Sequence, residues 1–245
     1  MPQYQRPPIT EAVIELRFEQ ANKDDVLDQY KRRMSDEYPV SEEGATLQLS
    51  MDLRDMKMHA GKARVAAKTY KLTRGDGAAL LLISPQSVGF IQLAPYTDWT
   101  DFRANSQRLW GEWKRIAGYR KLSRVGLRYV NRIDVPDESD GKIEPEEYLL
   151  FAPQLPSFEP PWTPFSYETV VRGPFSDSCN VLLRSGIVPP AIVKHFSLLL
   201  DIDVSRDSDV PQNDDEMWTV LDSMRDIKNM IFEGSITDSA RRLFD

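Results

Sequence analysis

The chain is poor in the residues that build disulfide-linked and metal-stabilised folds. Its 245 residues include one cysteine, Cys179, and two histidines, His59 and His195. A single cysteine cannot form an internal disulfide, and this composition is typical of proteins kept in a reducing cytoplasm. The two histidines lie far apart and near no cysteine, so no zinc-binding pattern is present. A disulfide-stapled or zinc-stabilised fold is therefore not expected.

Long apolar runs and known catalytic motifs are also missing. No stretch reaches the roughly 18 apolar residues of a membrane-spanning helix, and the N-terminus lacks the apolar core of a secretory signal. We therefore expect a cytoplasmic protein that does not enter a membrane. The chain has no G-x-S-x-G nucleophile elbow, no P-loop and no G-x-G-x-x-G turn. The sequence therefore assigns no enzymatic activity and no cofactor.

Acidic residues outnumber basic ones, which gives a formal net charge of -7 at pH 7. Non-specific nucleic-acid binding needs a broad cationic surface, so nucleic acid is not the expected partner. This argument concerns the whole chain and leaves room for a local basic patch. The content of hydrophobic residues, 41 %, and of charged residues, 28 %, is typical of soluble globular proteins.

Residues 123–134, in the middle of the chain, predict a long strand with two different faces. Odd positions are mostly apolar, and even positions carry three arginines: Arg124, Arg128 and Arg132. Successive side chains of a strand point to opposite faces, so one face would be buried and the other cationic. Asn131 interrupts the apolar row, where its amide needs hydrogen-bond partners from the backbone or from a cavity.

Residues 11–18 and 196–205 alternate in the same way and predict two further strands. Opposite their apolar residues they carry charged side chains, mainly acidic: Glu11, Glu15, Arg17, Asp201 and Asp203. If the three strands are neighbours, acidic rows would flank the arginine row. The simplest interpretation is a solvated ladder of ion pairs, each contributing a few tenths to about 1 kcal/mol.

A functional interpretation of this charged face is a ligand site. Arg128 and Arg132 could hold a phosphate or carboxylate, and the carboxylates could orient the ligand. The candidate ligand-binding residues are Arg128, Arg132, Glu15, Asn131, Asp201 and Asp203. Asp201 and Asp203 form a D-x-D on one strand face, which could also bind Mg²⁺ or Mn²⁺, although this short motif occurs by chance in many acidic chains.

The remaining pattern predicts alternating groups of strands and helices. Strands are expected over residues 45–53, 67–72, 78–83, 87–93, 166–172 and 180–186, and helices over 23–35, 98–119, 144–151, 214–232 and 237–244. Asn22 is a candidate cap for the first helix. The pair Gly173-Pro174 is a candidate turn between two strands, and Gly234 is a candidate end for the helix that begins at residue 214. The proline-rich residues 152–165 predict a surface loop whose aromatic residues, including Trp162, could form an interface.

The helix predicted over residues 98–119 carries three of the five tryptophans: Trp99, Trp110 and Trp113. Aromatic side chains at helical spacing usually pack a helix against a sheet. The alternative is a platform on which bases or another flat ligand stack. The element order then predicts an α+β fold made of two similar β-α-β(n)-α units, residues 1–122 and 123–245. Together they would form a large, mainly antiparallel, curved sheet with the long helices on one face.

Four ordered blocks carry a family likeness: PPITEAVIELRF at 7–18, GLRYVNRI at 126–133, LDIDV at 200–204 and IFEGSITD at 231–238. In these blocks the chain resembles a sporadically distributed prokaryotic family of unknown function, with a PPIxEAVxExRF start, an LRYxNRI centre and an IFExSITD end. Its patchy distribution is similar to that of mobile defence and toxin–antitoxin genes. The resemblance implies such a setting and no mechanism.

Three functional hypotheses follow. The first is a binding protein that recognises a protein partner in a defence-like or toxin–antitoxin-like system. The second is a metal-dependent enzyme acting on a nucleotide or nucleic acid, with Glu11, Glu15, Asp201 and Asp203 around a divalent ion and Arg128 and Arg132 on phosphate. The third is a small-ligand or nucleotide sensor that uses the same face without chemistry. The sequence does not predict an oligomeric state.

Overall fold

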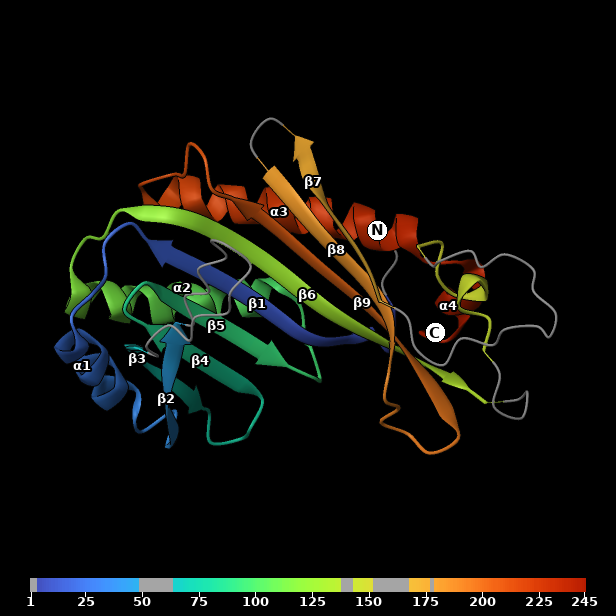
Figure 1. Cartoon of the computed structure of the whole chain (residues 1–245), viewed down its shortest axis with the longest axis horizontal. Coiled ribbons are helices and arrows are strands. Elements are labelled where there is room, and N and C mark those ends of the chain that lie inside the picture. Colours follow the sequence, from blue (N-terminus) through green and yellow to red (C-terminus); the bar gives the residue numbers. More distant parts are fainter. Residues whose placement is uncertain (1–3, 49–63, 138–142, 152–167, 177–178) are drawn as a thin grey trace, which may run out of the picture. The chain divides into compact units, whose positions relative to one another are not determined.

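The structure is a computed structural model that describes residues 4–48, 64–137, 143–151, 168–176 and 179–245. Within these ranges nine strands belong to one sheet, in the order β2-β3-β4-β5-β1-β6-β9-β8-β7, and there are four α-helices (Figure 1). The predicted α+β class with a large antiparallel sheet is confirmed. The internal duplication and the packing of the long helices on one face stay predictions.

The strands have the following bounds: β1 Ile9–Phe18, β2 Val40–Gln48, β3 Arg64–Thr73, β4 Ala79–Ser84, β5 Ser87–Leu93, β6 Leu122–Pro136, β7 Glu168–Ser176, β8 Cys179–Val188 and β9 His195–Arg206. The helices are α1 Asp24–Met34, α2 Trp99–Ala117, α3 Asp214–Ser235 and α4 Asp238–Arg242, and η2, Pro145–Glu147, is a turn of 3₁₀ helix.

The chain divides into two compact units. The β6 unit contains residues 1–14, 93–96 and 124–245, and the α2 unit contains residues 15–92 and 97–123. The N-terminal residues thus group with the second half of the chain, whereas the sequence placed them in a unit ending at residue 122. The two-part division of the sequence analysis, at residue 122, stays a prediction.

The core of the α2 unit is aromatic. Trp113 is fully buried between Phe18, whose ring stacks on it at 5.6 Å between centroids, and Tyr30, which meets it edge-on at 5.0 Å. The Tyr30 hydroxyl donates to the Leu109 carbonyl at 3.1 Å and so joins α1 to α2. Trp110 is also buried and stacks near Phe18. These two tryptophans therefore pack the helix, as the more frequent interpretation of the stripe predicts.

In the β6 unit, β6, β9, β8 and β7 pair in antiparallel order, and α3 runs along the sheet (Figure 1). The odd-numbered residues of β6 from Val125 to Val135 and the even-numbered residues of β9 from Leu198 to Val204 are buried, and so is one face of α3. The buried apolar set includes Leu127, Tyr129, Ile133, Leu198, Leu200, Ile202, Val204, Met217, Leu221 and Met224. The period-two pattern of the two strands therefore predicts the buried face correctly.

Four local predictions are wrong. Residues 144–151 form only η2, because Leu149 is drawn into an isolated β-bridge with Ile236 and is fully buried there. Gly173 and Pro174 lie inside β7, beside a bulge between Pro174 and Ser176. The α3 helix continues through Gly234 to Ser235.

The fourth wrong prediction concerns the start of α1. Lys23 occupies the cap position, and the Asn22 side chain instead donates to the Pro85 carbonyl at 3.0 Å and accepts from Arg120 at 2.9 Å. The proline-rich segment and its candidate interface residue Trp162 lie outside the described residues.

Candidate functional site

A ladder of ion pairs covers the polar face of β6, β9 and β8 in the β6 unit. Its centre is Asp201 on β9, which lies opposite Val130 on β6 and Arg184 on β8. Arg128 donates from Nε and Nη2 to the two Asp201 oxygens at 2.7 and 2.9 Å, and Arg184 donates to one of them at 3.1 Å. One carboxylate thus serves two guanidinium groups.

Burial makes Asp201 the anchor of this ladder. Its side chain is 3 % exposed, whereas those of Arg128 and Arg184 are 40 % and 35 % exposed. The hydrogen bond to Asp201 is also the main reason why the pKa of Arg128 lies above its usual value. A carboxylate removed from water is stabilised only when it is paired and hydrogen-bonded, and the two arginines supply both.

A second pair lies next along the ladder. Arg124 donates from Nη2 to both oxygens of Asp203, at 3.0 and 2.9 Å. The Arg124 guanidinium lies against Gly126, where a Cβ atom would clash with it. A glycine at this position therefore lets the arginine lie flat on the strand and reach β9.

Asn131 and Glu15 were also predicted as site residues. Asn131 is 1 % exposed on the opposite face of β6, where its Nδ2 donates to the Leu200 carbonyl at 2.9 Å. Because this bond to the main chain satisfies the buried amide of Asn131, no ligand is needed to explain its burial. Glu15 belongs to the α2 unit, where its carboxylate accepts from Arg17 Nε at 3.0 Å.

The geometry of Asp201 also bears on the metal hypothesis. Both of its oxygens accept from guanidinium groups, so a divalent ion there would have to replace arginine contacts. Across the described part of the chain, no group of three or more His, Cys, Asp or Glu side chains is arranged to hold a metal ion. The Mg²⁺ or Mn²⁺ site stays a prediction.

The polar face of β6 ends in a pocket of about 500 Å³, here called the arginine pocket. Its charged lining consists of Arg6 from the N-terminal segment, Arg132 and Asp134 from β6, His195 from β9 and Arg242 from α4. Its walls are otherwise largely apolar: Pro7, Pro8, Ile9, Ala94, Pro136, Ile192, Leu243 and Phe244. Arg132, one of the residues predicted from the sequence, lies in it.

The hydrogen bonds of the pocket leave donor groups available. Asp134 accepts from Arg132 Nε and Nη2, at 3.0 and 3.2 Å, and also from the Ser197 hydroxyl. Arg242 donates from Nη2 to the Ser239 hydroxyl at 2.9 Å, and Arg6 from Nη2 to the main-chain oxygen of Asp245 at 3.0 Å. Each guanidinium has five N–H donors, so each keeps donors that these bonds do not use.

The N-terminal segment holds one wall of the pocket in place. The Arg6 amide donates to the Phe244 carbonyl at 2.8 Å, and the Tyr4 hydroxyl lies 3.0 Å from both Glu233 carboxylate oxygens. The Tyr4 ring meets Phe244 edge-on at 5.3 Å. Burial and the hydrogen bond to Glu233 raise the pKa of Tyr4 to about 12, so the hydroxyl remains a donor at neutral pH.

Sequence patterns identified Arg132 and missed Arg6, His195 and Arg242. The missed residues lie near the two ends of the chain and at the start of β9, outside any alternating charged row. The backbone bonds from Arg6 to Phe244 and from Arg132 to Pro8 bring these distant segments together. No local signal in the sequence predicts such a meeting.

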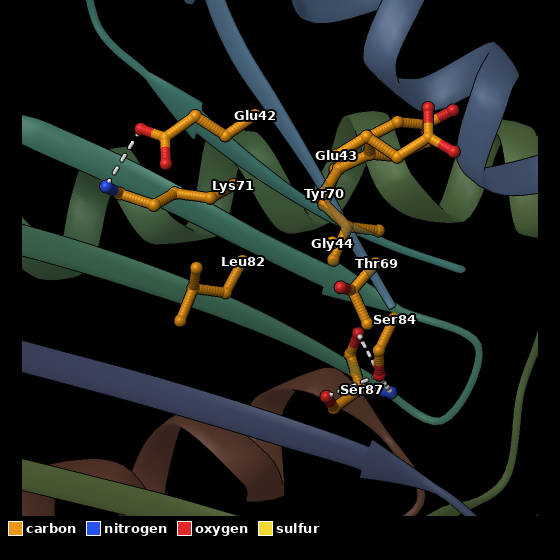
Figure 2. A pocket seen from close by; sticks show the side chains of 10 residues that line it. Glu42, Glu43, Gly44, Thr69, Tyr70, Lys71, Leu82, Ser84 and Ser87 are labelled. Carbon is orange, nitrogen blue, oxygen red and sulfur yellow. Dashed lines mark hydrogen bonds and ion pairs between the residues drawn. The ribbon is translucent and has the colours of Figure 1, made fainter. Parts of the chain in front are cut away.

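A different pocket, of about 340 Å³, lies over β2, β3 and β4 in the α2 unit (Figure 2). Its charged groups include one ion pair, in which Lys71 donates to Glu42 at 3.0 Å. Its two serines, Ser84 and Ser87, share a hydrogen bond of 2.8 Å. Lys71 is the one basic side chain among its described lining residues, and it is paired, whereas the arginine pocket has three arginines with unused donors and is therefore the better candidate site.

No protein-family model matches the chain, and no curated protein matches it significantly. The family resemblance stated from the four sequence blocks therefore stays a prediction. Among the residues described, none of the helices combines the length and hydrophobicity that would let it span a bilayer. The cytoplasmic location stays a prediction as well.

Proposed function

We propose that this protein is a binding protein and that it takes up a small anionic ligand in the arginine pocket. The observation that carries the proposal is the charge of the lining: three arginines and a single aspartate, in a chain whose net charge is -7. A cationic pocket in an acidic protein concentrates positive potential at one place. Anions would be attracted to that place rather than to the whole surface.

The partners of the arginines support this function. Asp134 pairs with Arg132, but within the described residues no carboxylate side chain pairs with Arg6 or Arg242. Guanidinium groups that have no carboxylate side chain as partner and that line a concave site can bind ligand carboxylates and phosphates. The apolar walls beside the arginines would lower the local polarity around a bound anion and so strengthen those bonds.

Calorimetric titration with phenyl phosphate and with benzoate tests the proposal. We expect at least one of the two anions to bind, and the Arg6→Gln/Arg242→Gln double variant to lose most of that affinity. The matched control is Arg33→Gln/Arg115→Gln, which removes the same two charges from exposed positions on α1 and α2. If neither anion binds the unmodified protein, or if the control weakens binding as much as the double variant, the proposal is wrong.

The hypothesis of a protein partner in a defence-like system stays a prediction from the sequence. So does the metal-dependent enzyme acting on a nucleotide or nucleic acid. An anion pocket is compatible with both hypotheses. Under either one, the pocket can be altered by substitution without changing the ion-pair ladder.

A further inference from the structure

We infer that the ligand of the arginine pocket is a phosphate monoester carrying an apolar or planar group, rather than a carboxylate. This inference rests on the proposed function and names the ligand class of the same site. It depends on three features of the pocket: the number of guanidinium groups, the net charge of the charged side chains that line it, and the apolar walls beside them.

The guanidinium groups come from three separate segments of the chain. Arg6 precedes β1, Arg132 lies on β6 and Arg242 lies on α4, yet all three line one pocket. A carboxylate has two oxygens, and a single arginine fork already engages both of them, although each can accept a further bond. A phosphate monoester has three terminal oxygens and can accept from three arginines at once. The donor count therefore favours phosphate.

The net charge of the lining points the same way. The three arginines carry three positive charges and Asp134 carries one negative charge, so these four side chains leave two positive charges. A phosphate monoester carries between about -1.5 and -2 at neutral pH, whereas a carboxylate carries -1. A phosphate monoester would therefore neutralise most of the positive charge of the lining, whereas a carboxylate would leave about one positive charge without a counter-charge.

Asp134 is a positioning residue in this arrangement. It engages Arg132 through Nε and Nη2, and its own carboxylate is held by the Ser197 hydroxyl. This contact fixes the plane of the guanidinium while Nη1 keeps its two N–H donors. A preorganised donor loses less entropy when the ligand arrives.

The walls indicate that the ester group is not strongly polar. The apolar side chains include Ile9, Ile192 and Phe244, and the volume of about 500 Å³ greatly exceeds that of a free phosphate. Pockets of ~300–1,000 Å³ with mostly apolar walls and few charged groups are typical of small organic ligands. A flat or apolar group attached to the phosphate would fill this space.

Four probes of related shape separate the possibilities: phenyl phosphate, benzoate, inorganic phosphate and phenol. We expect phenyl phosphate to bind at least about tenfold more tightly than benzoate or inorganic phosphate, and phenol not to bind, because only phenyl phosphate uses both the arginines and the walls. Arg242→Lys, which keeps the charge and removes the fork, should weaken phenyl phosphate binding about tenfold and change benzoate binding less.

The outcomes distinguish this inference from the proposed function. If benzoate binds as tightly as phenyl phosphate, the pocket is an anion site and the phosphate assignment is wrong. If inorganic phosphate binds as tightly as phenyl phosphate, the apolar group has no role and the inference also fails. If no anion binds, both fail. Circular dichroism and the melting temperature without ligand establish that Arg242→Lys is folded; should it unfold, Arg6→Lys provides the same comparison.

Discussion

Asp201 shows how a buried carboxylate can be stabilised in an open sheet. Its two oxygens accept three hydrogen bonds from Arg128 and Arg184, while those arginines keep part of their surface in water. The free-energy cost of removing a charge from water therefore arises mainly at Asp201. Ion pairs between exposed side chains contribute little, but removing the buried member of such a group leaves its partners without a counter-charge.

Asp201→Asn should therefore destabilise the protein by about 2–3 kcal/mol. This is less than the ~3–5 kcal/mol expected for a fully buried pair, because Arg128 and Arg184 can regain water. Asp203→Asn is the matched control: its side chain is 21 % exposed and pairs with Arg124, so we expect a loss of about 1 kcal/mol. Urea denaturation measures both. Equal losses, or a larger loss for Asp203→Asn, would contradict the central role of Asp201.

Lys228 is a second residue whose surroundings set its chemistry. It is 6 % exposed on α3, and its Nζ lies 4.0 Å from the centroid of the Tyr129 ring. Burial, and secondarily the positive charge of Arg225, lower the pKa of Lys228 to about 8. The aromatic face offsets only part of the cost of removing an ammonium group from water.

This shift predicts a stability that rises with pH. Between pH 8 and pH 10, Lys228 releases its proton in the folded protein while the unfolded chain, with an ordinary pKa of 10.5, keeps it. The unfolded state then binds more protons, so the free energy of unfolding should rise by about 2 kcal/mol over this range. In Lys228→Met this rise should be absent. Urea denaturation at several pH values tests it, and parallel profiles for the two proteins would exclude the assigned pKa shift.

At the level of secondary structure, alternation was the most informative signal in the sequence. It predicted β5 with its observed bounds, and it predicted β6 and β9 with their buried faces, because a two-sided strand repeats its environment every second residue. The failures occur where tertiary contacts override local preference. The helical turn ends at Leu149, which pairs with Ile236. Pro174 lies inside β7, next to a bulge.

The candidate site could be predicted only in part for the same reason. Arg128, Arg132, Asp201 and Asp203 lie in alternating rows, and the ion pair of Arg128 with Asp201 follows from those rows once the strands are neighbours. The arginine pocket combines Arg132 with residues from both ends of the chain. Their meeting depends on the backbone bond between Arg6 and Phe244, which no periodicity encodes.

The N-terminal segment should behave as one element with the end of α3 and with Phe244, which follows α4. Tyr4→Phe keeps the ring contacts with Phe232 and Phe244 and removes only the hydroxyl that bonds to Glu233. We expect a loss of roughly 0.5–1.5 kcal/mol in the free energy of unfolding and weaker binding of phenyl phosphate, because Arg6 lies in the same segment. Thermal melting and calorimetry measure the two effects.

The same substitution has a pH signature. The pKa of Tyr4 is raised from 10.0 to about 12 in the folded protein, so its contribution is complete below pH 10 and is lost as the pH rises through 12. Tyr4→Phe should therefore differ from the unmodified protein at neutral pH and approach it in strongly alkaline solution. A difference that stays constant up to pH 12 would show that the hydroxyl does not stabilise the segment.

At the scale of the whole molecule, the net charge opposes the local charge of the pocket. The chain carries -7, whereas the lining of the arginine pocket is positive. A polyanion placed at the pocket would extend beyond it and be opposed by the net negative charge of the chain. A small anion lies within the pocket and experiences mainly the local field, because charges farther than about 10 Å are screened at 0.1 M salt.

We therefore expect the protein to discriminate by ligand size. At about 0.15 M salt, phenyl phosphate should bind, and a short duplex oligonucleotide should neither bind nor displace it, because duplex binding needs a continuous cationic surface. Fluorescence anisotropy of a labelled duplex, with phenyl phosphate as competitor, measures both. The Arg6→Gln/Arg242→Gln variant is the control for the site. If the duplex binds at this salt concentration and phenyl phosphate displaces it, the pocket belongs to a nucleic-acid surface and the small-ligand assignment is wrong.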